Sequence, residues 1–467
     1  MTRRLFKLAA LPLALLAVAG CTSLAPKYER PAAPVAPAFS AEPDAAGQAQ
    51  ASSIDWQNYF ADERLKRLVA VALANNRDLR VAVLNIEQAR ATYGIRRADR
   101  FPTVNAVATE TRQPATPTTP ATLYTVGLSV SAYELDLFGR VHSLSNAALA
   151  QYFATEEGRK TAQISLVAAV ANAYLTLIAD DELLGLTRET LKTREESYKL
   201  SKLKFDNGAA SEIDFRLTES LLESARASLA QFTRQRAQDE NALVLLLGQG
   251  LPADLPPPLA MSEQRLATDL PVGLPSEVLA RRPDVLQAEQ QLISANANIG
   301  AARANFFPRI TLTASAGTAS TELNGLFKSG SSAWTFAPQI VLPIFDAGRN
   351  KANLEVSKVN RDIAVAQYEK AIQSAFREVQ DALAGRATLG EQARAQLAQT
   401  NAEQVRFRLA DLRYRNGASS YLDVLDAQRS LFTAQQSLVQ VQAQQVQNLV
   451  TLYKVLGGGW TEPPAAK

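Results

Sequence analysis

The sequence is poor in the residues on which redox and metal chemistry depend, with one cysteine, one histidine and two methionines among 467 residues. A single cysteine cannot form an intramolecular disulfide, and one histidine leaves too few ligands for a His/Cys metal site. The sequence also lacks the nucleophile–base spacing that hydrolytic enzymes need. We therefore expect no metal and no cofactor, and we do not expect an enzyme.

The chain also lacks an excess of charge of either sign. It has 49 basic and 46 acidic residues, and three of the basic ones (Arg3, Arg4 and Lys7) lie in a predicted leader. Without that leader the two signs balance, which disfavours a nucleic-acid partner held by bulk charge. Charged residues make up 20% of the chain and the mean hydropathy is −0.10. These values disfavour a bundle of membrane-spanning helices.

Residues 1–20 have the features of a lipoprotein signal peptide. The first seven are basic in character, and the following apolar run is too short to span a bilayer. The segment ends in Val-Ala-Gly-Cys, which resembles the lipobox of bacterial lipoproteins, and the only cysteine of the chain, Cys21, stands at the cleavage position. An ordinary secretory signal followed by a stray cysteine is the alternative.

The lipobox resemblance implies cleavage before Cys21 and a covalent lipid on its sulfur. Thr22 follows, where lipoproteins held at the inner membrane typically carry aspartate, so the resemblance implies the outer membrane of a Gram-negative bacterium. Residues 21–53 are rich in proline and are predicted to form an extended, lipidated N-terminal tether.

The remainder of the chain contains two copies of one pattern. Gly94 recurs as Gly300 at an offset of 206 residues, and Gly139 recurs as Gly348 at an offset of 209. A period of about 200 residues indicates a duplicated domain and is too long for a solenoid. We predict a first repeat over residues 54–250, a linker over 251–274, a second repeat over 275–457 and a C-terminal tail over 458–467.

Each repeat contains segments in which apolar and small polar residues alternate. In the first repeat one predicted face consists of Tyr124, Val126, Leu128, Val130 and Ala132, and the other of threonine, glycine and serine. This period of two indicates a half-buried sheet, and it also fits a membrane barrel with an apolar side toward lipid. The lipoprotein leader favours the barrel.

Two strands per repeat give four per chain, whereas a small closed barrel needs about eight. The strands can therefore form a pore only if several copies of the chain assemble, and three copies would supply twelve. The proline- and threonine-rich residues 113–122 are predicted to be the loop between the first two strands.

A very long helix is predicted after each pair of strands. Residues 139–206 and residues 347–415 contain no proline, and a helix of that length at about 1.5 Å per residue spans roughly 100 Å. An Asn-Gly pair follows each long helix and reverses the chain. Return helices are predicted over residues 211–247 and 419–456.

Several of these features occur together in one known family. The lipobox, the duplicated hairpins, the Phe-Pro before each strand pair, the sequence LPIFDAGR at 342–349 and the sequence YRNGASSYLDVLDAQRSL at 414–431 resemble the TolC-like outer-membrane efflux channels. The lipoprotein branch typified by OprM is the most similar. The resemblance extends from about residue 21 to Trp460. It implies an α+β membrane protein, a homotrimer whose twelve-stranded transmembrane barrel receives four strands per chain and continues into a periplasmic tunnel of long helical hairpins.

The resemblance also implies partners and a function. Such channels dock with a periplasmic adaptor (membrane-fusion) protein and an inner-membrane pump of the resistance-nodulation-division class. They are passive conduits, gated at the periplasmic end, through which small toxic compounds and drugs leave the periplasm. Export of heavy metals or of proteins (type I) is the alternative within this class. A structural periplasmic coiled-coil lipoprotein is the alternative from another class.

The periplasmic gate implied by the resemblance lies just inside the second hairpin tip. Asp423 and Asp426 match the two constriction aspartates of the family, and Leu422 matches a constriction leucine. Their three-residue spacing puts both carboxylates on one helix face, and threefold symmetry would turn them into two carboxylate rings. Helix capping and stabilisation of the helix dipole are the alternative roles. Asp214 and Tyr414 match a family pair that hydrogen-bonds neighbouring hairpins in the closed state.

The hairpin tips are the predicted surface for docking the adaptor, because small residues there let another backbone approach closely. The family's tip arginine is not reproduced, since Ser419 aligns with it, and Arg413 or Arg415 are the candidates to replace it. The acidic run at 180–182 lies in mid-helix and is predicted to be a solvated face. The predicted tip residues are Asn207, Gly208, Ala209, Asn416, Gly417 and Ala418.

Overall fold

The computed structural model describes residues 23–36, 54–116, 119–264, 266 and 281–460. The predicted signal peptide and Cys21 lie outside these residues, as do parts of the predicted tether, linker and tail. Two short helices come first in the described chain, α2 (Trp56–Tyr59) and α3 (Glu63–Asn75).

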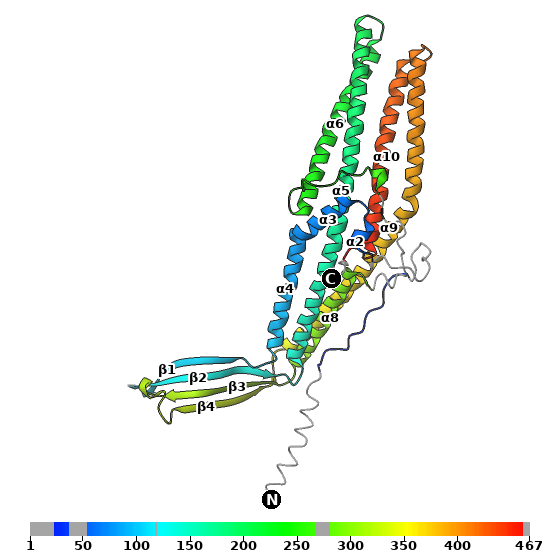
Figure 1. The fold of residues 1–467 in the computed structure, drawn as a ribbon. Helices are drawn as coiled ribbons and strands as arrows, with labels where there is room; N and C mark the ends of the chain where they lie inside the picture. The colour runs from blue at the N-terminus through cyan, green and yellow to red at the C-terminus, as the bar shows by residue number, and fades with distance from the viewer. Residues whose placement is uncertain (1–22, 37–53, 117–118, 265, 267–280, 461–467) are drawn as a thin grey trace. The chain divides into compact units, whose positions relative to one another are not determined.

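The order of elements is the same in the two halves of the chain, namely a helix, two strands, a long helix and a return helix (Figure 1). The first half contains α4 (Arg77–Ala98), β1 (Val104–Thr116), β2 (Thr119–Leu135), α5 (Arg140–Asp206) and α6 (Glu212–Leu247). The second half contains α8 (Pro283–Ala304), β3 (Arg309–Ser320), β4 (Ser332–Val341), α9 (Arg349–Arg415) and α10 (Tyr421–Val455). Two 3₁₀ turns complete the described elements, η2 (Met261–Glu263) and η3 (Leu323–Gly325).

The predicted long helices are confirmed, since α5 and α9 each contain 67 residues. Each ends at a glycine in the left-handed region, Gly208 with φ 69° and Gly417 with φ 71°. This conformation lets the following alanine N–H bond back to the helix, from Ala209 to the Lys204 carbonyl at 2.7 Å in the first hairpin. The reversal that starts each return helix is therefore built into the local sequence.

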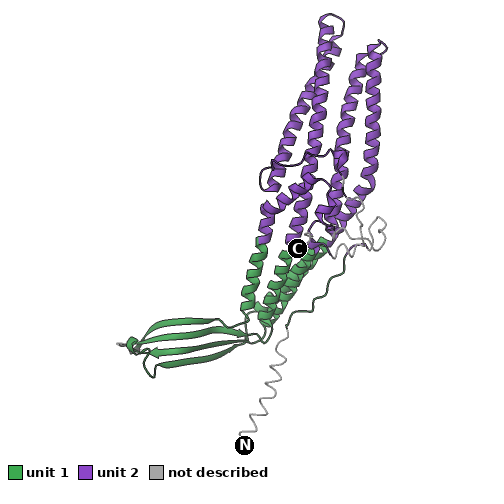
Figure 2. Ribbon diagram, in the orientation of Figure 1, with its two compact units in different colours: residues 1–33, 84–157, 286–371 green, residues 34–83, 158–285, 372–467 purple. Residues whose placement is uncertain are grey.

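The chain divides into two compact units, which Figure 2 shows in different colours. Unit 1 comprises residues 1–33, 84–157 and 286–371 and contains the sheet. Unit 2 comprises residues 34–83, 158–285 and 372–467 and contains both hairpin tips.

The sheet of unit 1 is antiparallel, with the strand order β1-β2-β3-β4. Cross-strand partners share a face, and the two faces differ as the alternation predicted. One row across the sheet is apolar and consists of Ala106, Leu128, Ala316 and Trp334. The next row is polar and consists of Asn105, Ser129, Ser315 and Thr335.

The predicted loop at residues 113–122 is wrong in its extent. β1 continues to Thr116 and β2 begins at Thr119, and Gln113 pairs with Ala121. Most of this segment is therefore strand. Threonine favours strands, and proline is tolerated where a strand has no neighbour on one side, as at Pro114 of the edge strand β1 and at Pro120, which precedes the pairing of β2 with β3. The turn-like composition of the segment concealed both facts.

The alternation in β2 also ends earlier than predicted. A bulge between Val130 and Tyr133 leaves Ala132 with φ 53°, and the Ala132 N–H donates to Thr313 Oγ1 at 3.2 Å. Beyond the bulge Tyr133 lies opposite Leu312. Tyr133, and not Ala132, therefore continues the apolar face, because an extra residue in one strand reverses the alternation that follows it.

The main core lies in unit 2, where α2 and α3 pack with the long helices. The rings of Tyr59 and Tyr453 stack with centroids 4.0 Å apart. The Tyr59 hydroxyl donates to the Leu449 carbonyl at 2.8 Å, and the Tyr453 hydroxyl donates to that of Ile54 at 2.6 Å. Residues from the two ends of the chain thus close the core together.

One described helix, α5, is long and apolar enough to cross a membrane by length and composition alone, with a mean hydropathy of 1.7 over 18 residues. Within the protein, however, 67% of that window is buried. This burial is the property of a core helix, and the apolar window is accounted for by packing.

Candidate functional site

The predicted gate residues lie in the first turns of α10, within unit 2. Asp423 forms a capping box with Ser420, in which the Asp423 N–H donates to Ser420 Oγ at 3.4 Å and the Ser420 N–H donates to Asp423 Oδ2 at 3.2 Å. These bonds satisfy backbone donors that a helix start leaves free. The capping role considered as an alternative for this aspartate is therefore present in the chain. The capping box fixes the position of the carboxylate. The Asp423 side chain remains exposed, so the carboxylate lies at the surface.

Asp426 is held by two arginines. Arg406 of α9 contacts one carboxylate oxygen at 2.5 Å, and Arg429 of α10 contacts the other at 2.6 Å. The hydrogen bond from Arg406 holds the pKa of Asp426 below its usual range, so this carboxylate is charged at neutral pH. Within one chain the predicted acidic face thus carries cations beside one of its two carboxylates. Leu422, next to this face, has a relative exposure of 53%.

The predicted pair Asp214 and Tyr414 makes bonds with two other residues of this chain. Asp214 accepts from the Ser211 hydroxyl at 2.7 Å, at the N-terminus of α6. Tyr414 of α9 accepts a hydrogen bond from the Lys204 ammonium of α5, which also lies 4.9 Å from the centre of the tyrosine ring. The Lys204–Tyr414 contact links the two hairpins within one chain, a role that the sequence did not assign to Lys204.

The predicted tip residues are exposed in both hairpins. Asn207 and Asn416 close the two tips in the same way, each donating from its side chain to a carbonyl four residues earlier at 2.7 Å. Of the two candidates to replace the family's tip arginine, Arg413 donates to the Ala418 carbonyl at 3.4 Å and Arg415 pairs with Asp411 at 2.9 Å. Both bonds remain within the second hairpin.

Comparison with known proteins decides the family. The sequence model of the outer membrane efflux protein family matches residues 68–249 and 274–458 of the chain. The toluene efflux pump outer membrane protein TtgC of Pseudomonas putida is 49% identical over 460 residues, 95% of this chain and 93% of that protein. Outer membrane protein OprJ of Pseudomonas aeruginosa is 48% identical over 453 residues, 95% of this chain and 94% of its own.

The solved MtrE outer membrane channel of Neisseria gonorrhoeae in its open state has a TM-score of 0.87 and 44% identity, covering 94% of this chain and 99% of that one. The chain belongs to the outer membrane efflux protein family. It is an outer-membrane channel component of an efflux system, and the predicted fold class, duplicated helical hairpins with four strands, is confirmed.

Besides Lys204, two further cationic residues of this efflux protein were not singled out from its sequence. Arg406 was missed because its partner Asp426 lies on another helix. Arg194 of α5 is buried, donates to the Leu221 carbonyl at 2.7 Å and lies 5.3 Å from the centre of the Phe432 ring of α10. Burial lowers the pKa of Arg194. A charged residue on the buried face of a helix is the sequence signal that could have revealed it.

The acidic run at 180–182 was predicted to be a solvated face, which is correct for the exposed Asp181 and wrong for the buried Asp180. Asp180 has a relative exposure of only 5%, and burial together with a hydrogen bond that its protonated form donates to Asp239 raises its pKa to about 7. Asp181 pairs with Arg236 at 2.6 Å. Glu182 accepts a hydrogen bond from a backbone N–H of η2 at 2.9 Å. The prediction failed for Asp180 because this acid lies against Asp239 of another helix, which the local sequence does not reveal.

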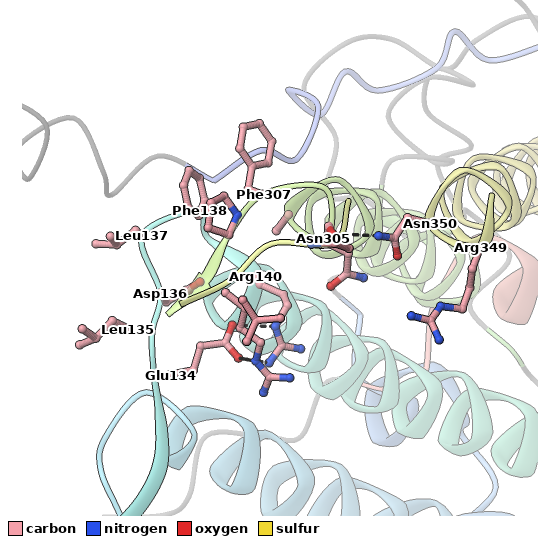
Figure 3. Close-up of a pocket in the computed structure, with 15 residues that line it drawn as sticks. Glu134, Leu135, Asp136, Leu137, Phe138, Arg140, Asn305, Phe307, Arg349 and Asn350 are labelled. Atoms are coloured by element: carbon pink, nitrogen blue, oxygen red, sulfur yellow. Dashed lines mark hydrogen bonds and ion pairs between the residues drawn. The ribbon is translucent and has the colours of Figure 1, made fainter. Parts of the chain in front are cut away.

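A small cavity of about 220 Å³ lies in unit 1 where strands and helices meet (Figure 3). Glu134 accepts two bonds from Arg140 at 2.7 Å and pairs with Arg309 at 2.6 Å. These ion pairs fix the connection between β2 and α5. Arg349 also lines the cavity, as the counterpart of Arg140 in the second repeat, but Pro343 stands at the position that corresponds to Glu134. The two junctions are therefore not equivalent.

Proposed function

We propose that three copies of this chain form one gated, passive channel that conducts small toxic compounds from the periplasm to the exterior. The sheet carries this proposal. It has four strands, one apolar and one polar face, and edges at β1 and β4 that leave backbone donors and acceptors unpaired in the chain. A membrane tolerates such strands only in a closed barrel. Twelve strands from three copies would close it.

The substrate class follows from the relatives. The names of similar proteins include efflux pumps for toluene, for solvents and for antibiotics. These compounds are small and largely apolar, which supports organic solvents and drugs as the exported compounds of this channel. Heavy metals or proteins remain the alternative cargo. A conduit of this kind needs no catalytic group, so we propose that the chain is not an enzyme.

The hairpin tips are the proposed docking surface for a periplasmic adaptor, and an inner-membrane pump of the resistance-nodulation-division class would deliver the cargo. Exposed small residues at both tips support this assignment. Leu422, Asp423 and Asp426 would line the closed entrance, and the contact between Lys204 and Tyr414 would hold the two hairpins together while the channel is closed.

Lipidation of Cys21 is the proposed second attachment to the outer membrane. Replacement of Cys21 with alanine should abolish incorporation of labelled palmitate, while partial export survives because the barrel itself holds the protein in the membrane. Palmitate in the mature Cys21→Ala protein would disprove the lipid site without affecting the proposed channel.

The channel itself is tested by deleting the gene and measuring sensitivity to a panel of solvents, antibiotics, dyes and metals, with the intact gene restored as the control. We expect increased sensitivity to solvents and antibiotics, and ion conductance from the purified protein in planar bilayers. Sensitivity to metals alone would favour heavy-metal export. A protein that conducts no ions and protects against none of the compounds would favour a structural lipoprotein.

A further inference from the structure

The described N-terminal segment is bound to α8 through its backbone. Within unit 1, the Arg303 guanidinium donates to the Leu24 carbonyl at 3.0 Å, and the Asn296 amide donates to the Pro26 carbonyl at 2.8 Å. Both donors belong to α8. An extended segment has free carbonyl groups, and these two side chains satisfy them.

Glu289 lies two turns before Asn296 in α8 and binds two side chains of the same segment. Its Oε1 accepts from the Tyr28 hydroxyl at 2.9 Å and from Arg30 Nε at 2.7 Å, and its Oε2 accepts from the other Arg30 nitrogen at 2.5 Å. A carboxylate that receives a guanidinium in this two-pronged way forms one of the stronger hydrogen-bonded pairs in proteins. The Glu289 side chain is only 7% exposed. The segment therefore covers this charge and supplies its counter-charge.

The binding residues form one stripe on α8. Glu289, Asn296 and Arg303 are spaced by seven residues, which brings them to the same face of a helix. Gly300 lies in this stripe, and a Cβ atom there would be 2.7 Å from the Ala25 nitrogen and 2.6 Å from Ser143 Oγ. Only glycine leaves room for the segment at this point.

The first repeat has no such stripe, although α4 is the counterpart of α8. Gly94 corresponds to Gly300, but Arg90 stands at the position of Asn296 and Val83 at that of Glu289. A Cβ atom at Gly94 would have no atom within 4 Å among the residues that the structure describes. The stripe is therefore a specific feature of the second repeat and not a by-product of the duplication.

We propose that this stripe of α8 is a binding groove for an extended peptide, and that its occupant is the segment 23–30 of the same chain. The ligand that it recognises presents two free backbone carbonyls, followed by a tyrosine and an arginine two residues apart. The bound segment also reaches the start of α5, where the Ser23 and Ser143 hydroxyls are 3.1 Å apart. It thus acts as a latch that ties α8 to α5 within unit 1.

The direction of the bound segment has a consequence for membrane attachment. Residue 24 lies beside Arg303, near the end of α8 that leads into β3, and residue 30 lies beside Glu289 toward the other end. Only Thr22 lies between Cys21 and Ser23, and two steps along the chain span at most about 7 Å. A lipid on Cys21 would therefore be tied to the strand end of unit 1. This consequence rests on the proposed lipidation, whereas the latch does not.

Limited proteolysis of the purified full-length protein in detergent tests the latch, because Lys27 is exposed and its bond to Tyr28 is a trypsin site. Gly300→Ala adds one methyl group against the segment, and Gly94→Ala adds the same group where space is open. Both changes favour the helix itself to the same extent. We expect cleavage after Lys27 to be about 10-fold or more faster in Gly300→Ala, because cleavage follows the population of the open form, and unchanged in Gly94→Ala. Equal cleavage in wild type and Gly300→Ala would overturn the proposal.

A charge exchange tests the recognition of Arg30. Arg30→Glu and Glu289→Arg should each increase the cleavage rate, and the double variant should regain most of the protection because the pair is restored in reverse. A double variant as sensitive as either single one would exclude this pair as the basis of binding. Protection that disappears on dilution to separated chains would show that a neighbouring copy supplies the segment, which contradicts the assignment to the same chain. None of these measurements depends on export.

Discussion

The two hairpins share their backbone design but differ in where they bury charge. Ser211 and Ser420 cap the return helices at positions 209 residues apart, and the tip glycines adopt the same left-handed conformation. The first hairpin buries Asp180 and Arg194, whereas leucine and glutamate stand at the corresponding positions 389 and 403 of the second.

This difference separates what the fold requires from what it permits. Caps and turn glycines recur because each long helix must end and reverse in the same way. Buried charges do not recur, because the two hairpins have different neighbours within unit 2. Near the tips both hairpins carry exposed charges, and in the second hairpin Arg406 and Arg429 hold Asp426, whereas in the first Lys202 pairs with Asp206.

The largest expected effect on export concerns the two hairpin tips, which share the sequence Asn-Gly-Ala. Ala418→Trp and Ala209→Trp should each reduce drug export strongly, toward the level of the deletion strain, because a bulky side chain at an exposed small residue blocks close approach of the adaptor. Ala227→Trp, in the exposed middle of α6, is the control and should export normally. Dye accumulation and drug sensitivity measure the effect, with the amount of assembled protein checked in the membrane. Normal export by both tip variants would remove the tips from the docking surface.

The buried acid of the first hairpin should make stability depend on pH. The pKa of Asp180 is about 7 in the folded protein, against an ordinary value of 3.8. Between these two pH values Asp180 holds a proton in the folded state that it has lost in the unfolded state. The free energy of unfolding therefore falls as the pH rises from about 4 to 7, and it levels off above pH 7. Asp180→Asn should remove this fall and stabilise the protein at pH 8, by on the order of a few kcal/mol.

Chemical unfolding in detergent at pH 4.5 and pH 8 measures the contribution of Asp180. Asp206→Asn, in the same helix, is the control, because its ion pair with Lys202 is exposed and such pairs contribute about 0–1 kcal/mol. If Asp180→Asn retained the pH dependence of the wild type, another group would be responsible for it.

The long helices and their turns could be predicted from the sequence, because their signals are local. Absence of proline and an Asn-Gly turn fixed α5 and α9 almost to the residue. The short helices α2 and α3 were not predicted, because their place depends on Tyr59 packing against Tyr453 from the other end of the chain. The same limit applies to the candidate site. The cap of Asp423 and the pair of Asp426 with Arg429 are local patterns on one helix. The contacts of Arg406 with Asp426 and of Lys204 with Tyr414 form only when different helices pack.

The link between the hairpins should hold the resting channel closed. Lys204→Met removes the bond to Tyr414, and we expect the resting conductance in planar bilayers to increase by about 5-fold, as the loss of about 1 kcal/mol from one hydrogen bond implies. Lys202→Met is the control, because Lys202 pairs with Asp206 on its own helix and joins no second hairpin. Equal conductance in the two variants would mean that the contact between Lys204 and Tyr414 does not restrain opening.

The two predicted gate aspartates should differ in how strongly they bind cations. Asp426 already has two arginine partners, whereas the Asp423 carboxylate accepts from the Ser420 backbone N–H, which brings no full charge. Asp423→Asn should therefore weaken block by a trivalent cation from the periplasmic side more than Asp426→Asn does, and Arg406→Gln should strengthen block by freeing Asp426. The double variant should lose the block with assembly unchanged.

Capping alone predicts a different result for the same residues. Asp214 and Asp423 occupy equivalent cap positions in the two hairpins, so replacing either one with asparagine should lower the stability of its return helix by a similar amount, about 0.3–1 kcal/mol. Only Asp423→Asn should also weaken the cation block, because the proposed carboxylate rings contain Asp423 and Asp426, whereas Asp214 is a predicted member of the hydrogen-bonded pair that closes neighbouring hairpins. Bilayer conductance of Asp214→Asn and of Asp423→Asn, each with and without the trivalent cation, separates the two roles. If Asp423→Asn and the double variant were blocked as strongly as the wild type, these aspartates would be caps and not a gate.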